Sequence, residues 1–100
     1  MRNYEIMFIV KPTLSEDEIG KVAESFKGTL ESQGSKVTGV DVWGQKPFAY
    51  EIKSRSDLFK SGYYYVYQVE ASDDSGIKEF DRLARISNDI IRHLIIRKED

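Results

Sequence analysis

The spacing of apolar side chains changes along this chain between the period of a strand and the period of a helix. Few folds have strands and helices in the order that results. Segments of strand and helix character follow one another as 3–10 (strand), 15–33 (helix), 36–53 (strand), 63–70 (strand), 72–86 (helix) and 90–97 (strand). Because crossover connections are right-handed, this β-α-β-β-α-β order places the first and third strands in the middle of an antiparallel sheet of order 4-1-3-2. The sequence therefore predicts an α+β, ferredoxin-like two-layer sandwich, with two helices on one face of the sheet.

The helical segments carry their own start and stop signals. Ser15 and Glu18 form a capping box, and Gly34 stands where a helix ends in the left-handed conformation. The apolar stripe of the first helix is Ile19, Val22, Phe26 and Leu30. The second helix has candidate caps and a stripe, namely Ser72, Asp73 or Asp74, followed by Ile77, Phe80 and Ala84 with Leu83 beside them. Both stripes predict helices that bury one side against the sheet.

The second strand is irregular, and its irregularities predict its place in the sheet. Val37 is out of phase with Val40 and Val42, and a bulge at Gly39 would restore the phase. Pro47 cannot donate to a strand ladder, so this strand is expected at an edge of the sheet. The 4-1-3-2 order also places the second strand at an edge.

The remaining segments differ in the burial that they predict. Residues 54–62 are polar and rich in turn formers, and we expect them to form an exposed hairpin loop. Residues 63–70 (YYYVYQVE) have the clearest strand composition in the chain. The near-continuous apolar run at residues 90–97 predicts a last strand that is buried on both faces.

Length and composition restrict the class of protein. A chain of 100 residues predicts one domain, residues 1–100. The sequence has no cysteine, which excludes disulfides, thiolate nucleophiles and cysteine-based metal sites. No apolar run approaches the ~20 residues that a membrane-spanning helix needs, and no signal-peptide pattern opens the chain. A cytoplasmic protein is therefore expected.

Charge is unevenly distributed along the chain. The net charge of −2 argues against binding nucleic acid through bulk charge alone. Residues 14–33 and residues 68–82 each contain five acidic and two basic residues. Residues 44–62 contain four basic and two acidic residues, and residues 85–98 contain four basic and one acidic residue. The sequence thus predicts acidic helices and basic strand regions.

Alternation along the strands predicts an apolar patch on the face of the sheet that the helices leave open. If Ile6, Phe8 and Val10 point toward the helices, the outward side chains of the three adjoining strands include Met7, Ile9, Tyr64, Val66, Leu94 and Ile96, with Glu5 and Arg92 at the rim. Monomeric proteins rarely expose a large contiguous apolar area without using it. We expect a partner on this face, either a second copy of the chain or a different molecule.

Three arginines stand out among the basic residues. Arg2, Arg92 and Arg97 lie on the first and fourth strands, which are adjacent in the predicted order, and guanidinium groups there can bind phosphates through paired hydrogen bonds. In contrast, the basic residues of the hairpin are expected to be solvated, namely Lys53, Arg55 and Lys60. A few phosphate contacts give modest affinity, which suits a protein that binds RNA together with another protein.

The residue pattern does not predict a catalytic site. The only histidine, His93, lies in a strand of buried type, and no serine or aspartate spacing near it suggests a triad. The sequence has no metal-ligand cluster and no glycine-rich phosphate loop. We therefore predict a protein that is not an enzyme and that holds no cofactor and no metal.

Two other functions fit parts of the pattern. A dimeric ferredoxin-like small-molecule sensor or enzyme would close two sheets over a ligand, as a concentration-dependent homodimer. A free single-strand RNA binder would stack bases on the outward aromatic residues of segment 62–67, which partly resembles the third-strand motif of RNA-recognition domains. In this chain Tyr64 replaces the small residue of that motif, and Gln68 replaces its closing aromatic residue.

Three segments follow patterns that occur together in one family, namely residues 1–6 (MRNYEI), 43–52 (WGQKPFAYEI) and 90–97 (IIRHLIIR). They resemble the Met-Arg-x-Tyr-Glu start, the Trp-Gly-x-Arg-x-Leu-Ala-Tyr-x-Ile stretch and the Val-Ile-Arg-x-Met-Val-x-Arg ending of the bacterial small-subunit ribosomal protein S6 family. The resemblance spans about residues 1–98, with the segments in the right order and with helices of the right length between them.

This resemblance implies a structural role in the small ribosomal subunit, without catalysis. It implies two partners, the central domain of small-subunit ribosomal RNA and ribosomal protein S18, with which the family forms a heterodimer. Carried over by position, the RNA-binding residues are Arg2, Arg92 and Arg97, with Lys46 where the family usually has arginine. Pro47 replaces a residue that is often basic or polar, and the hairpin at 54–62 is longer than usual, so no contact is carried over to that hairpin.

Overall fold

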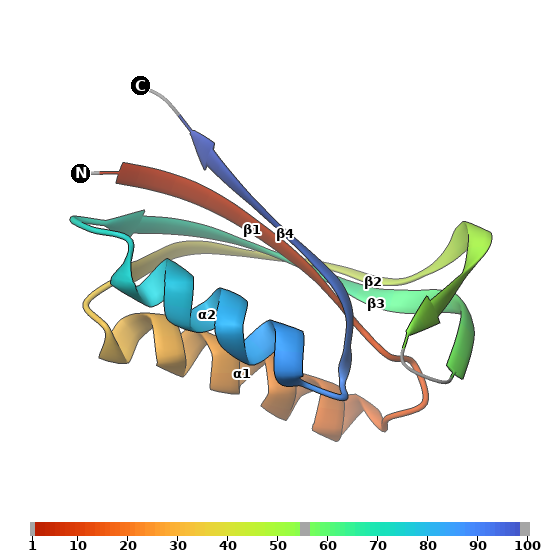
Figure 1. Cartoon of the computed structure of the whole chain (residues 1–100). Helices are drawn as coiled ribbons and strands as arrows, with labels where there is room; N and C mark the ends of the chain where they lie inside the picture. Colours follow the sequence, from red (N-terminus) through yellow and green to blue (C-terminus); the bar gives the residue numbers. More distant parts are fainter. Residues whose placement is uncertain (1, 55–56, 99–100) are drawn as a thin grey trace.

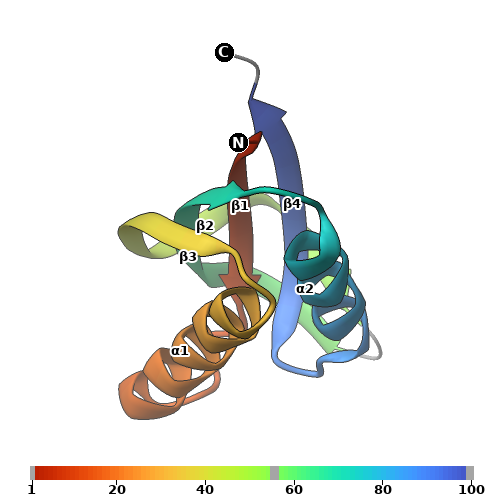
Figure 2. The ribbon, with the colours of Figure 1, turned by 90° about the vertical axis from the view of Figure 1, so that its left-hand side faces the viewer.

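The elements of the structure follow the predicted order. The computed structural model describes residues 2–54 and 57–98, so Arg55 lies outside the described residues. The elements are β1 (Arg2–Val10), α1 (Glu16–Ser32), β2 (Lys36–Ser54), β3 (Asp57–Ala71), α2 (Ser75–Ile86) and β4 (Ile90–Lys98). The strands form one antiparallel sheet in the order β2-β3-β1-β4, with both helices on one face (Figure 1, Figure 2). The predicted ferredoxin-like fold and the 4-1-3-2 strand order are confirmed.

Aromatic rings fill the centre of the core between the sheet and the helices. Phe8 of β1 is fully buried, and its ring centroid lies 5.1–5.8 Å from those of Phe26, Tyr65, Tyr67 and Phe80. These neighbours come from α1, β3 and α2. Aromatic pairs at such distances contribute about 0.5–1.5 kcal/mol beyond the burial of their area. Packing around Phe8 therefore joins both helices to the two central strands.

Both ends of α1 are capped as the sequence predicts. The Ser15 hydroxyl oxygen accepts from the backbone N–H of Glu18 at 3.3 Å, and the same hydroxyl donates to the Glu18 carboxylate at 3.0 Å. At the other end, Gly34 has a φ of 87°. The two hydrogen bonds of a Schellman motif follow there, from Gly34 N–H to the carbonyl of Glu31 and from Ser35 N–H to the carbonyl of Leu30.

The second helix begins at Ser75, three residues later than predicted. Asp74 occupies the N-cap position but makes no side-chain capping bond. The carboxylate of Asp73 accepts from the backbone N–H of Ser75 at 3.0 Å and from its hydroxyl at 2.5 Å. These hydrogen bonds hold the pKa of Asp73 below its usual range. The predicted buried residues Ile77, Phe80 and Ala84 are confirmed.

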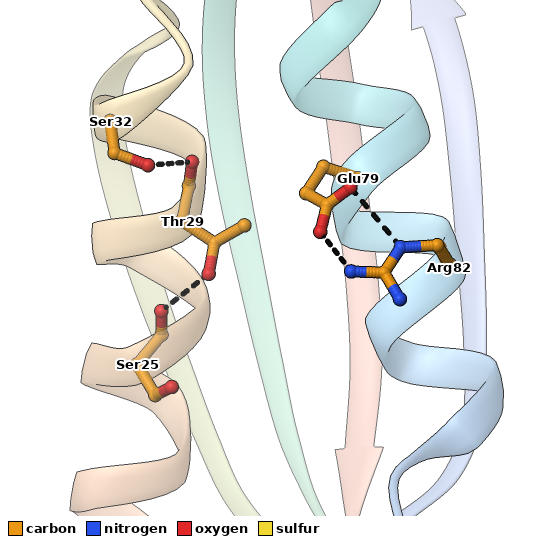
Figure 3. Close-up of polar contacts among 5 residues, drawn as sticks. All are labelled: Ser25, Thr29, Ser32, Glu79 and Arg82. Carbon is orange, nitrogen blue, oxygen red and sulfur yellow. Dashed lines mark hydrogen bonds and ion pairs between the residues drawn. The ribbon is translucent and has the colours of Figure 1, made fainter.

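The outer surfaces of the helices are held by short-range polar contacts (Figure 3). In α1 the Thr29 hydroxyl donates to the carbonyl of Ser25 at 3.1 Å, and the Ser32 hydroxyl donates to the carbonyl of Thr29 at 2.9 Å. In α2 Arg82 donates to the Glu79 carboxylate through Nε and Nη2. Exposed contacts of this kind contribute ~1 kcal/mol or less each. The positions of the helices therefore depend mainly on their buried stripes.

One buried hydroxyl links α1 directly to the sheet. The hydroxyl of Tyr67 donates to the carbonyl of Ala23 at 2.6 Å, and burial raises the pKa of Tyr67. We expect Tyr67→Phe to lower the free energy of unfolding by about 1–1.5 kcal/mol, because it removes this hydrogen bond and keeps the ring. Urea denaturation measures the change. Tyr63→Phe is the control, since Tyr63 is only half-buried, and an equal loss in the two variants would contradict the assignment.

The hairpin between β2 and β3 is strand for most of its length. Residues 54–62 were predicted as a loop, but β3 begins at Asp57, and Phe59 pairs with Ile52 across the hairpin. The prediction of a loop is therefore wrong for Ser54 and for residues 57–62, and residues 55–56 lie outside the described residues. The strand extends into this segment because the Phe59 side chain is buried, with 9% of it exposed. Phe59 lies next to Leu58 in an otherwise polar segment, so the sequence gave no alternating pattern there.

The irregular edge strand is confirmed. β2 is hydrogen-bonded to one strand only, and its register shifts at three places, between Val37 and Gly39, between Val42 and Gly44, and between Pro47 and Ile52. The first shift is the bulge that the sequence predicted at Gly39. At the second, Gly44 has a φ of 79°, a conformation that glycine adopts without a steric penalty.

The last strand, β4, is not buried on both faces. Only Ile90 is buried in this strand, and Leu94 and Ile96 are 50% and 45% exposed. The prediction is wrong because β4 is an edge strand whose open face no helix covers. An apolar run shows that side chains avoid water, but it does not show whether the same chain or another molecule covers them.

Candidate functional site

The open face of the sheet presents the predicted patch as three cross-strand rows. Paired residues of neighbouring antiparallel strands point to the same face. The register gives the rows Tyr64–Ile9–Arg92, Val66–Met7–Leu94 and Gln68–Glu5–Ile96. All six residues of the predicted apolar patch therefore share the face opposite the helices.

Two of these six side chains are nevertheless covered. Ile9 is 5% exposed and Val66 is 4% exposed, so the prediction of exposure is wrong for both. Aromatic residues of β2 lie over this part of the sheet. The ring of Trp43 stacks on Tyr64 with centroids 6.0 Å apart, and the ring of Phe48 meets Tyr64 edge-on at 6.2 Å. The chain itself therefore covers the half of the patch next to the β2–β3 hairpin.

A glycine permits this close packing. A Cβ atom at Gly62 would collide with Cγ2 of Ile9 and would lie 2.9 Å from Cζ of Phe48. Both side chains therefore rest against the bare backbone of Gly62. The sequence indicated Gly62 as part of a turn-rich segment and as the first residue of segment 62–67, but not as a site of close packing.

The uncovered half of the patch surrounds a small hollow. Its volume is about 120 Å³, and its lining residues are Glu5, Met7, Trp43, Val66, Leu94 and Ile96. Four of them belong to the predicted patch, whereas Trp43 was not predicted there. Alternation from Val42, which faces the helices, would have placed Trp43 on the open face. The hollow is smaller than the roughly 300–1,000 Å³ of small-molecule sites and is large enough for a protein side chain.

A polar network closes one end of the hollow. The Gln68 side-chain amide donates to the Glu5 carboxylate at 2.9 Å, and the Lys98 ammonium donates to Gln68 Oε1 at 2.8 Å. Lys98 also lies 3.8 Å from the Glu5 carboxylate. The network fixes Glu5 beside Ile96, so the apolar hollow has a polar rim with its charges paired.

Two of the predicted RNA-binding residues lie at the end of the sheet that carries the chain termini. Arg2 pairs with Ala71, and Arg97 pairs with Tyr4. Tyr4 and Ala71 belong to the core, so both arginines point to the helix side of the sheet. Figure 1 shows the start of β1 and the end of β4 at this same end of the sheet.

The other two basic residues lie on the opposite face and toward the other end. Lys46 pairs with Gly62, and Arg92 pairs with Ile9, so both point to the open face. Five residues of β1 separate the level of Ile9 from that of Tyr4, which is about 17 Å along the strand. Arg2, Arg92 and Arg97 lie on the adjacent strands β1 and β4, as predicted, but Arg92 points to the other face of the sheet.

Three of these four cations have no ion-pair partner within residues 2–54 and 57–98. Lys46, Arg92 and Arg97 are exposed and form no ion pair there. The basic residues of α2 differ, because Lys78 is paired with the N-cap residue Asp74, and Arg82 and Arg85 are paired with carboxylates of α2. Lys46, Arg92 and Arg97 are therefore available to an external anion, unlike the basic residues of α2.

His93 is part of a contact between α2 and β4. Its Nε2 lies 2.7 Å from Oδ1 of Asp81, and its ring meets Phe80 edge-on at 6.1 Å. Nη2 of Arg85 lies 3.0 Å from the other oxygen of Asp81. The hydrogen bond from His93 holds the pKa of Asp81 below its usual range, with Arg85 adding to the effect. The sequence did not predict Asp81 as the partner of His93, because the two residues belong to different elements.

Neither a metal centre nor a membrane span is found in the part of the chain that the structure describes. No three side chains of histidine, aspartate or glutamate gather there in a way that could hold a metal ion. No described helix is both long enough and apolar enough to cross a membrane.

Comparison with known proteins gives a consistent result for sequence and structure. The sequence profile of ribosomal protein S6 matches residues 3–97. The small ribosomal subunit protein bS6 of Carboxydothermus hydrogenoformans is 41% identical over 99 residues, which cover 99% of this chain and 98% of that relative. The crystal structure of 30S ribosomal protein S6 from Thermotoga maritima has a TM-score of 0.87 and 33% identity, and the match covers 97% of this chain and 87% of that one. The chain therefore belongs to the ribosomal protein S6 family.

Proposed function

We propose that this ribosomal protein of the small subunit binds the central domain of small-subunit ribosomal RNA together with ribosomal protein S18. In this proposal residues 1–100 act as one domain, with a structural role and without catalysis, in the cytoplasmic ribosome. The observation that carries the proposal is the apolar hollow on the open face, whose rim residues Leu94 and Ile96 are half exposed. S18 is the partner that the family resemblance implies, and we assign it to this surface.

The composition of the open face suits a protein partner. Trp43, Leu94 and Ile96 surround the hollow, and tryptophan is among the residues that contribute most to binding at protein interfaces. The paired charges of Glu5 and Lys98 form the polar rim that such interfaces usually have. A side chain of S18 inserted between these residues would remove them from water.

The charge of the chain suits RNA binding in company with a basic partner. A protein of net charge −2 gains little affinity for RNA from bulk charge, so affinity must come from a few placed cations. Lys46 and Arg92 lie on the open face beside the proposed seat of S18, and Arg2 and Arg97 lie near the chain termini. RNA that contacts both Arg92 and Arg97 would pass over the free edge of β4, whereas Lys46 lies on β2 at the other edge of the sheet.

The salt dependence of RNA binding tests these four residues. We expect Lys46→Ala with Arg92→Ala, and separately Arg2→Ala with Arg97→Ala, to lower the slope of log Kobs against log salt by about 1.5, because each phosphate contact contributes about 0.7–0.9. The measurement is filter binding of the protein–S18 complex to a central-domain RNA fragment at several salt concentrations.

A matched control distinguishes the effect of losing specific phosphate contacts from the effect of lowering the net charge. Lys78→Ala with Arg82→Ala removes the same charge from the outer surface of α2, where both residues are already paired. This variant is expected to keep the parent slope. An equal decrease in all three double variants would assign the effect to net charge and would remove the four residues from the RNA site.

The two other functions receive less support from the structure. A small-molecule sensor or enzyme that closes two sheets over a ligand would use the open face, where the hollow of about 120 Å³ is small for such a site. A free single-strand RNA binder would need the outward ring of Tyr64, but Trp43 is already stacked on that ring.

A further inference from the structure

A second groove lies on the other side of the sheet, between α1 and the edge strand β2. Its volume is about 500 Å³, and its lining includes Gly20 and Glu24 of α1, Val40 and Val42 of β2, and Tyr65. Val40 and Val42 are 45% and 59% exposed although both point to the helix side of the sheet. The groove therefore has an apolar floor that neither helix covers.

The width of this groove is fixed by the packing of α1. The hydrogen bond from the Tyr67 hydroxyl to the carbonyl of Ala23 holds the helix at a set distance from the sheet, and both residues line the groove. Gly20 adds room, because no atom lies within 4 Å of the position that its Cβ would take. Glycine lowers the stability of a helix interior, so Gly20 leaves this space open and makes α1 less stable.

The floor of the groove borders on a free strand edge. β2 has a hydrogen-bonded neighbour on one side only, and the stretch from Gly39 to Val42 is in regular register with β3. The backbone groups on its other side are able to pair with one more extended segment, as in complexes where a peptide adds a strand to a sheet. An extended occupant would lie with alternate side chains over Val40 and Val42.

The charged side chains of α1 that line the groove, here called the wall, indicate which kind of molecule binds there. The wall carries three carboxylates and two ammonium groups, from Glu16, Asp17, Glu24, Lys21 and Lys27. The whole of α1 contains five acidic and two basic residues. The wall therefore has a net charge of −1 and the whole helix a net charge of −3, which favours a basic occupant over nucleic acid, and the long stems of lysine and arginine pack well on exposed valines.

From these features we infer that the α1–β2 groove binds a lysine- or arginine-rich extended segment of another protein. The segment adds a short strand along Gly39–Val42, its basic side chains lie on Val40 and Val42, and their charged ends reach Glu16, Asp17 and Glu24. This site lies on the face opposite to the proposed S18 and Arg92 surface, so the two can be occupied together.

The probe is the labelled peptide acetyl-Lys-Val-Lys-Val-Lys-Val-Lys-amide, with its binding to the whole protein measured by fluorescence anisotropy at low salt. We expect saturable binding with a Kd below ~1 mM. We expect Gly20→Gln to weaken it by roughly tenfold or more, because the new side chain fills the groove. The same substitution should raise the Tm by roughly 4–8 °C, since a better helix former replaces glycine.

Gly28→Gln is the matched control, because Gly28 lies in the same helix, is equally free of neighbours within 4 Å and does not line the groove. It should raise the Tm by a similar amount and leave the affinity unchanged. The triple variant Glu16→Gln, Asp17→Asn and Glu24→Gln should also lose binding. Absence of binding at ~1 mM peptide, parent affinity in Gly20→Gln, or equal binding of a peptide with glutamate in place of lysine would overturn the inference.

Discussion

Phe8→Ala is expected to lower the free energy of unfolding by about 3–5 kcal/mol, the largest single effect on stability that the structure predicts. The ring is fully buried and touches four other aromatic rings from three elements. Removing it leaves a cavity that rigid aromatic neighbours cannot fill by small movements. Small domains have a total stability of about 5–15 kcal/mol, so the variant would be close to the limit of folding. Urea denaturation followed by circular dichroism measures the loss.

Phe48→Ala is the comparison for this variant. Phe48 is half-buried on the open face, and its ring meets only Tyr64 among the aromatic residues. We expect it to cost about 1–2 kcal/mol, in the middle of the range for single substitutions. If Phe8→Ala cost no more than Phe48→Ala, the two layers would not depend on the aromatic cluster around Phe8.

The fold was predictable because each element carries local signals that agree with one another. The period of the apolar residues identifies strand or helix, and the caps at Ser15 and Gly34 mark where α1 begins and ends. The bulge at Gly39 and the edge position of β2 follow from one misplaced valine and one proline. With six elements in this order, the handedness rule for crossovers leaves few arrangements, and the strand order follows from it.

The burial of the open face was less predictable, because it depends on contacts between elements. Ile9 and Val66 have the alternation of exposed residues, yet Trp43 and Phe48 reach over the sheet and cover this region. That reach depends on register shifts in β2, and only the first of these had a signal in the sequence. The contact between His93 and Asp81 was missed for the same reason, since nothing in the spacing of two residues shows that their elements meet.

The separation of the basic residues could have been predicted. Side chains alternate between the two faces of a strand, so an outward Arg92 places Arg97, five residues later, on the helix side. The register confirms this, because Arg92 pairs with Ile9 and Arg97 pairs with Tyr4. Both arginines lie on β4, and alternation places their side chains on opposite faces of the sheet. Whether they touch RNA depends on a surface that alternation does not describe.

Leu94→Glu is expected to weaken binding to ribosomal protein S18 by about 100-fold or more, with little change in the stability of the protein alone. Leu94 lines the hollow and is half exposed in the free chain, so a glutamate there remains solvated before binding. Under a partner its carboxylate would be buried without a cation, which costs several kcal/mol. A loss of about 2.8 kcal/mol corresponds to 100-fold in Kd, and isothermal titration calorimetry with purified S18 measures it.

Ile86→Glu is the control, because Ile86 is also a large exposed apolar residue but lies at the end of α2, on the helix side of the sheet. It should bind S18 like the parent protein. A third variant, Val42→Glu, places the same charge in the α1–β2 groove. If Val42→Glu lost S18 binding and Leu94→Glu kept it, S18 would occupy the groove beside α1, and the apolar hollow on the open face would need another partner. Loss in Leu94→Glu alone places S18 on the open face, because the three variants add the same charge at three separate apolar surfaces.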